Sequence, residues 1–168
     1  MKRRVFSLLS TLCVLCALGS LAPKTAAAQA NNSYTYILSG QYAMQFTGTI
    51  NLPAPFNTYN GPFSRNGKVV FDGNGNFTAT VIANYNGTIT HDNFTGTYVA
   101  SYDGSFTMTI VNLPTPLFPP GTPNVFTFDG ILANNGNIAK LTLDGVSVGG
   151  QVQTNVGSVI VGELIKQY

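Results

Sequence analysis

The chain has 168 residues, of which only 8% are charged, and its formal net charge is +2. It contains two cysteines and one histidine, too few to build a zinc or haem site from spaced ligands, and we expect no metal and no cofactor. Its few basic residues are scattered, which argues against a nucleic-acid-binding surface.

The first 30 residues have the organisation of a secretory signal peptide. Lys2-Arg3-Arg4 precedes an apolar stretch from Val5 to Leu21, and cleavage sites follow at Ala26-Ala27-Ala28 and Ala28-Gln29-Ala30. A membrane anchor is the alternative, but the stretch is shorter than the roughly 20 residues that a span needs. We therefore predict cleavage near residues 28–30, export to the periplasm or the cell exterior, and one domain over residues 31–168.

Removal of this segment changes the chemistry of the chain. Both cysteines, Cys13 and Cys16, leave with it, so the remaining domain has neither a thiol nor a disulfide. Four basic residues then stand against six acidic residues, a net charge of −2. The domain must be held together by burial of its apolar residues.

From Tyr36 onward, apolar residues alternate with threonine and other polar residues, the period of a half-buried β-strand. Asp-Gly and Asn-Gly steps, which favour tight turns, divide these stretches. The eight steps begin at Asn60, Asn66, Asp72, Asn86, Asp103, Asp129, Asn135 and Asp144. The pattern predicts an all-β domain, a single antiparallel β-barrel of roughly eight strands.

The second half of the chain repeats the first. Gly40-x-Tyr42, Phe46-Thr47-x-Thr49-Ile50 and Asn51-Leu52-Pro53 return about 60 residues later as Gly96-x-Tyr98, Phe106-Thr107-x-Thr109-Ile110 and Asn112-Leu113-Pro114. This predicts an internal pseudo-twofold repeat of two β units.

Two proline-rich loops, Asn51 to Asn66 and Asn112 to Asn124, occupy equivalent places in this repeat. Both carry apolar residues, among them Leu52, Phe56, Leu117 and Phe118. We expect these residues to cap an end of the barrel. The alternative is a paired lid over the mouth of a ligand site.

Few residues have the potential for catalysis or metal binding. Asp72-x-Asn74-x-Asn76 begins like a calcium loop, but the glycine and the acidic residue that such a loop requires later are missing. Glu163, the only glutamate, would be a proton-transfer group if it pointed inward, and His91 could be its partner. We expect both to lie at the surface, and we assign no catalytic residue.

Part of the sequence carries a resemblance to known proteins. Val69 to Asn76, Asn86-Gly87 and Phe94 to Tyr98 resemble small secreted bacterial proteins of unknown function. The chain is also loosely similar to calycin and allene-oxide-cyclase-like barrels. In lipocalins and avidins a Gly-x-Trp opens a strand at the barrel end. Gly40-x-Tyr42 and Gly96-x-Tyr98 would take that place, since the chain has no tryptophan. No position matches a catalytic motif of these families.

The sequence favours a secreted barrel that binds a small apolar or aromatic ligand over an enzyme. The inward faces would supply the ligand contacts: Tyr42, Met44, Phe46, Tyr85, Tyr98, Tyr102, Met108, Phe126 and Phe128. The same residues could instead fill the interior. The alternatives are a cyclase or isomerase that uses Glu163, an outer-membrane barrel, and a structural surface protein. The oligomeric state stays open.

Overall fold

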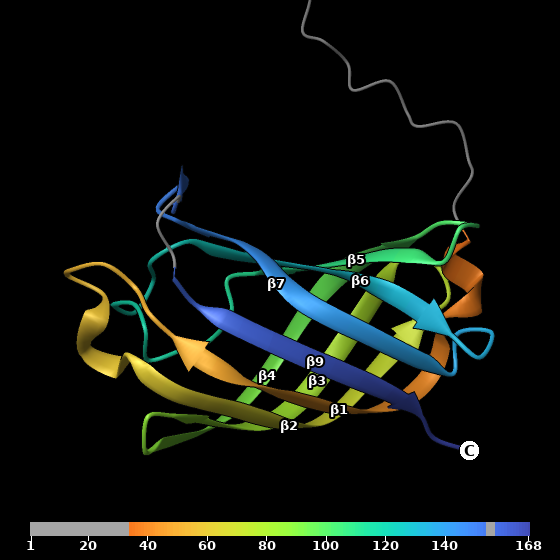
Figure 1. Ribbon diagram of the computed structural model, residues 1–168, viewed down its shortest axis with the longest axis horizontal. Coiled ribbons are helices and arrows are strands. Elements are labelled where there is room, and N and C mark those ends of the chain that lie inside the picture. The colour runs from red at the N-terminus through yellow and green to blue at the C-terminus, as the bar shows by residue number, and fades with distance from the viewer. Residues whose placement is uncertain (1–33, 154–156) are drawn as a thin grey trace, which may run out of the picture. The chain divides into compact units, whose positions relative to one another are not determined.

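The computed structural model describes residues 34–153 and 157–168 (Figure 1). The predicted signal peptide lies outside these residues and stays a prediction. The strands are β1 (Ser39–Ile50), β2 (Gly61–Asp72), β3 (Asn76–Tyr85), β4 (Thr88–Ala100), β5 (Ser105–Val111), β6 (Asn124–Ala133), β7 (Ile138–Val148), β8 (Gln151–Val152) and β9 (Val159–Lys166). Two short 3-10 helices are η1 (Thr35–Ile37) and η2 (Asn57–Tyr59). No helix in the described ranges is long and apolar enough to cross a membrane.

Eight of these strands form a closed antiparallel barrel. Strands β1 to β7 each pair with the next in chain order, β9 pairs with β7, and β9 also pairs with β1 to close the ring. Figure 1 shows β7, β9 and β1 side by side along one wall. The two-residue strand β8 is an addition that pairs only with the end of β7. The predicted all-β antiparallel barrel is confirmed.

Strict alternation explains why the strands close around an apolar interior. In β3, Phe77, Val81 and Tyr85 are buried while Thr78 and Thr80 are exposed. The inward side chains pack as interlocking aromatic rings, such as Phe71 and Tyr98 with centroids 4.9 Å apart. An eight-stranded barrel is narrow enough for such side chains to fill it.

One end of the barrel is closed by the segment that precedes β1. The Tyr98 hydroxyl donates a hydrogen bond to the Leu38 carbonyl at 2.8 Å, and the Tyr42 hydroxyl donates to the Gly136 carbonyl at 2.7 Å. Burial raises the pKa of Tyr42 to about 12, so its hydroxyl stays protonated and able to donate. We call this the tyrosine end.

Three of the predicted Asx-Gly turns are wrong, because Asn66-Gly67, Asp129-Gly130 and Asp144-Gly145 lie within strands. A Cβ atom on Gly67 would lie 2.3 Å from the Thr80 carbonyl oxygen, and one on Gly130 would lie 1.9 Å from that of Lys140. Glycine at these two positions allows close approach of neighbouring strands. The predicted loop 51–66 is also too long, since β2 already begins at Gly61.

The architecture does not show the internal repeat. The two proline-rich loops connect β1 to β2 and β5 to β6. Gly40-x-Tyr42, however, lies in the same strand as Phe46, whereas Gly96-x-Tyr98 lies in β4, one strand before Phe106. The pseudo-twofold repeat therefore stays a prediction from the sequence.

The calcium-like motif is a self-contained turn between β2 and β3. Asp72 Oδ1 accepts hydrogen bonds from the backbone N–H groups of Asn74 and Asn76, at 2.7 and 2.9 Å, and Oδ2 accepts one from the Asn76 amide at 2.8 Å. The Asn76 amide and these N–H groups hold the pKa of Asp72 below its usual value. In the described part of the chain no three acidic, histidine or cysteine residues come together as a metal site.

We expect Asp72→Ala to lower the thermal unfolding temperature at neutral pH, and this difference from the parent protein should disappear in acid. The pKa of Asp72 is lower in the folded chain, so its stabilisation is present above about pH 3.9 and is lost as the pH falls through the folded value. Thermal melts over a pH series measure this. Asp144→Ala, at an exposed position within β7, is the control. An unfolding-temperature difference that is unchanged in acid would contradict the assignment.

Candidate functional site at the loop-covered end

The end of the barrel opposite the tyrosine end is covered by the β1–β2 and β5–β6 loops. Leu52 from the first loop and Leu113, Leu117 and Phe118 from the second are buried. The loops meet where the rings of Phe56 and Phe118 pack edge to face, with centroids 5.2 Å apart. The expectation that loop residues cap the barrel is confirmed.

Both loops are held by the same device, an asparagine that hydrogen-bonds to both sides of a leucine backbone. Asn60 accepts from the Leu52 N–H at 2.8 Å and donates to the Leu52 carbonyl at 2.9 Å. Asn124 does the same for Leu113, at 2.9 and 3.3 Å. We call each of these asparagine–leucine pairs a clamp. Each clamp fixes the leucine of a Leu-Pro pair over the end of the barrel, so both loops have a defined conformation there.

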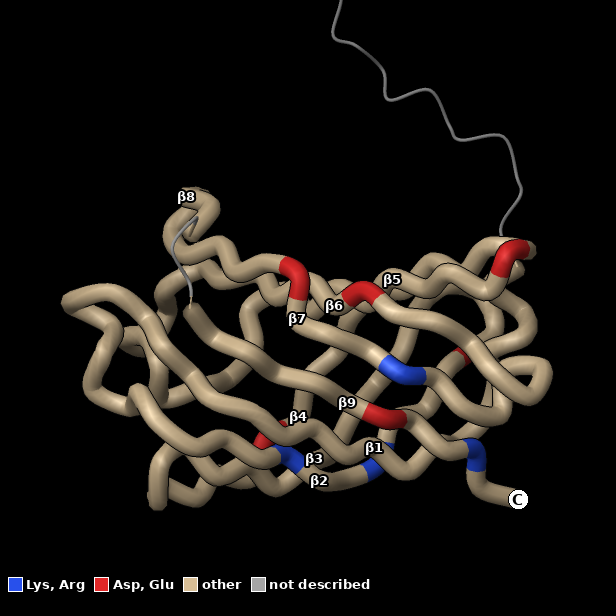
Figure 2. The backbone as a smooth tube through the Cα atoms, viewed as in Figure 1, with Lys and Arg blue, Asp and Glu red and all other residues tan. Residues whose placement is uncertain are grey.

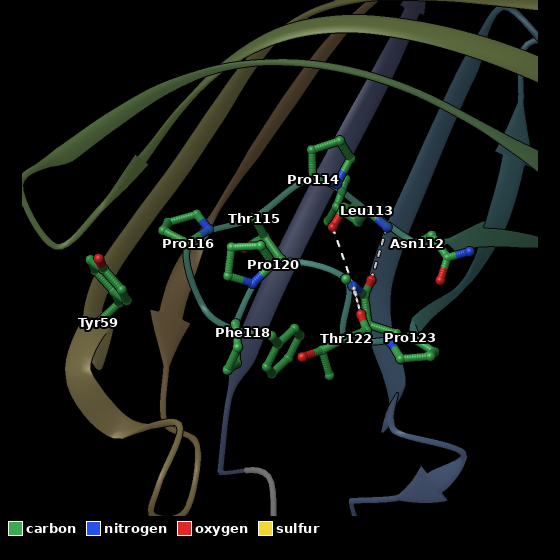
Figure 3. A pocket seen from close by; sticks show the side chains of 13 residues that line it. Tyr59, Asn112, Leu113, Pro114, Thr115, Pro116, Phe118, Pro120, Thr122 and Pro123 are labelled. Atoms are coloured by element: carbon green, nitrogen blue, oxygen red, sulfur yellow. Dashed lines mark hydrogen bonds between the residues drawn. The ribbon is translucent and has the colours of Figure 1, made fainter.

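A groove of about 850 Å³ lies outside this cover (Figure 3). The β5–β6 loop forms most of its wall through five prolines and Phe118, and Tyr59 of η2 faces it from the other loop. The ring of proline fixes the backbone angle φ, so a wall built from five prolines is stiff. The groove has the size of a site for a small organic molecule.

A second, much smaller cavity of about 20 Å³ lies beneath the cover, inside the barrel. Its walls are mainly apolar, with Phe126, Phe128 and Ile160 among them, and Arg65 and Tyr85 also line it. Leu113 is the residue that lines both hollows. The inner cavity has room for about one water-sized group.

Arg65, on the wall of this cavity, belongs to a buried charge cluster. Arg65 on β2 and Asp92 on β4 are each 5% exposed, and Arg65 Nη2 lies 3.4 Å from Asp92 Oδ2. The same Nη2 donates to the Tyr85 hydroxyl. The guanidinium carbon lies 5.3 Å from the centroid of the Phe94 ring and 5.5 Å from that of Phe63, a cation–π arrangement. Burial raises the pKa of Tyr85, which keeps its hydroxyl neutral.

This cluster was not predicted from the sequence, in which Glu163 and His91 were the only charged or titratable residues considered as inward-facing candidates. The signal was present, because Arg65 has the parity of Phe63 and Phe71, and Asp92 has the parity of Phe94. Charged residues are rarely buried unless they are paired, so a charged residue in a strand is normally expected to face outward. Recognising Arg65 as inward-facing would have required identifying Asp92 as its partner.

The residues predicted to contact a ligand are buried inside the barrel with one exception. Tyr102 is 67% exposed, because β4 ends at Ala100 and the alternation does not continue into the turn. Among the nine, the inner cavity is lined only by Tyr85, Phe126 and Phe128. Tyr42 and Tyr98 instead serve the tyrosine end through their hydrogen bonds.

Glu163 and His91 lie on the outer wall of the barrel. Glu163 is 38% exposed, and its Oε1 lies 3.2 Å from the Nζ atom of Lys140 on the neighbouring strand β7. His91 is exposed in β4, opposite the exposed Ile82 of β3. The inward orientation that a catalytic role for Glu163 required is therefore not found.

Glu163→Gln should change the free energy of unfolding by at most about 1 kcal/mol, because exposed ion pairs contribute little. Urea denaturation of the variant against the parent protein measures this change, with Lys140→Met as the matched removal of the other partner. A loss of several kcal/mol would show that Glu163 has a larger role than its exposed ion pair provides.

Comparison of the chain with protein-family models, curated proteins and solved structures finds no match. The similarity to calycin and allene-oxide-cyclase-like barrels therefore stays a prediction. Function must be argued from the loop-covered end itself.

Proposed function

We propose that the protein binds a small, mainly apolar molecule at the loop-covered end of the barrel. The observation that carries this proposal is the groove of about 850 Å³ between the proline-rich β5–β6 loop and Tyr59. It combines stiff apolar walls with an aromatic face, features common in sites for small organic ligands. Much of the barrel interior is filled by its own side chains, which moves the proposed site from the barrel centre to this end.

The surface chemistry supports a binding role over the alternatives considered from the sequence. Charged positions are few and scattered over the barrel, as Figure 2 shows. The outer wall carries threonine, asparagine and glutamine together with exposed apolar residues such as Ile82, Ile131 and Val161. The interior is filled by apolar and aromatic side chains, whereas an outer-membrane barrel has a polar interior. An enzyme that uses Glu163 loses its support, because this residue faces outward. Export remains part of the proposal.

Titration with N-phenyl-1-naphthylamine, a neutral dye that fluoresces in apolar surroundings, tests this proposal. We expect saturable binding of one dye per chain. Tyr59→Ser should weaken it by about two- to tenfold, the usual contribution of an aromatic contact. Tyr102→Ser makes the same change at an exposed position in the β4–β5 turn and is the control. Absence of saturable binding, or equal losses in both variants, would refute the proposed site.

A further inference from the structure

Two buried side-chain atoms of the described chain lack any hydrogen-bond partner: Arg65 Nε and Thr90 Oγ1. Arg65 and Thr90 are related by strand pairing, since Arg65 is opposite Ala83, and Ala83 is opposite Thr90. Ala83, the residue between them, has only a methyl side chain, which cannot form a hydrogen bond with either. Buried polar atoms are normally satisfied, so these orphans require an explanation. Of the two residues only Arg65 lines the inner cavity, and a ligand there could reach its Nε–H.

Arg65 also lines the inner cavity, and both of its polar contacts run through Nη2. The orphan Nε–H can only donate, so the missing partner must be an acceptor. A cavity of about 20 Å³ has room for one oxygen atom but not for the body of an organic molecule. The groove has room for that body, and Leu113 lines both hollows.

The charge of the cluster restricts what the acceptor can be. Arg65 and Asp92 have opposite charges, lie 3.4 Å apart and are both 5% exposed, so the pair is already neutral. A carboxylate placed beside them would be a third buried charge with no counter-ion, which is strongly unfavourable. A carbonyl or hydroxyl oxygen would satisfy Nε without this penalty.

The geometry points to an uncharged ligand whose apolar body lies in the groove and whose single carbonyl or hydroxyl oxygen passes Leu113 to accept a hydrogen bond from Arg65 Nε. This inference rests on the proposed function and adds the class of ligand to it. The hydrogen bonds from Nη2 to Tyr85 and Asp92 and the contact with the Phe94 ring fix the position of the guanidinium.

Three probes with one ring system test it: naphthalene, 2-acetylnaphthalene and 2-naphthoate, each used to displace N-phenyl-1-naphthylamine at neutral pH. We expect the ketone to bind about tenfold more tightly than naphthalene and than naphthoate, in line with a hydrogen bond to a charged group. In the double variant Arg65→Met/Asp92→Leu, which removes both charges together, the ketone should lose this advantage while naphthalene still binds.

A second measurement does not depend on any variant folding. Arg65 is the only arginine after Arg4, so the Nε–H resonance of its side chain is readily assigned in a ¹H–¹⁵N spectrum. The ketone should shift this resonance and naphthalene should not. The inference is supported if the ketone both binds most tightly and is the probe that shifts this resonance.

The outcomes separate this inference from the proposed function. Equal affinities for the three probes, or failure of all three to displace a dye that does bind, would overturn the inference and leave the groove as a binding site. Tightest binding of naphthoate would overturn the requirement for a neutral ligand. Failure of the dye itself to bind would overturn both.

Discussion

Asp92→Leu should lower the free energy of unfolding by about 3–5 kcal/mol, because it leaves the Arg65 guanidinium buried without its counter-ion. The guanidinium would keep the Tyr85 hydroxyl and the neighbouring rings, which are weaker partners for a buried charge. Urea denaturation followed by circular dichroism measures the change.

The double variant Arg65→Met/Asp92→Leu is the comparison for this single variant, because it replaces both charges with apolar side chains. We expect it to be as stable as the parent protein or more stable, as is often found when a buried ion pair is replaced whole. A double variant as unstable as Asp92→Leu alone would show that the pair contributes net stability. A stable one would show that the barrel carries the pair for a reason other than stability.

That contrast bears on function. A buried ion pair with an unsatisfied donor is a poor way to stabilise an interior that is otherwise apolar and aromatic. Features that break the local rules of packing tend to lie at functional sites. Arg65 of this cluster lines the inner cavity beneath the covered end, and Leu113 lines both this cavity and the groove, so the cluster lies where a ligand contact would need it.

The barrel could be predicted from the sequence because period-two alternation directly reflects which side of a strand is buried. Alternation failed at specific places for physical reasons. It assigned Tyr102 to the interior because parity alone does not mark the end of β4. The Asx-Gly steps, read as turns, were misleading at Asn66-Gly67 and Asp129-Gly130, where glycine instead allows two strands to come close.

The candidate site was much less predictable. The proline-rich loops were recognised as a pair, but their asparagine clamps join residues 8 and 11 positions apart and depend on the folded shape of each loop. The charge cluster joins Arg65 and Asp92 across β3, so it needs the register of three strands. The sizes of the two hollows depend on side-chain packing, about which alternation carries no information.

Phe71→Ala should destabilise the protein by about 3–5 kcal/mol, the usual cost of removing a buried aromatic side chain. Phe71 is 2% exposed and belongs to the aromatic packing near the tyrosine end, with ring centroids 5.2 Å from Tyr42 and 4.9 Å from Tyr98. Its removal leaves a void between two rings whose hydroxyl groups are fixed to carbonyls at that end. Neither ring can therefore move freely to fill it.

Val70→Ala is the matched control, because Val70 is the preceding residue of the same strand, faces outward and is 36% exposed. We expect it to change stability by at most about 0.5 kcal/mol. Urea denaturation compares the two variants, and similar losses would contradict the assignment of the two faces of β2. Under conditions where Phe71→Ala remains folded, dye binding in the groove should be retained, because Phe71 lines neither hollow at the loop-covered end. Loss of dye binding in that folded variant would show that the packing around Phe71 also maintains the groove.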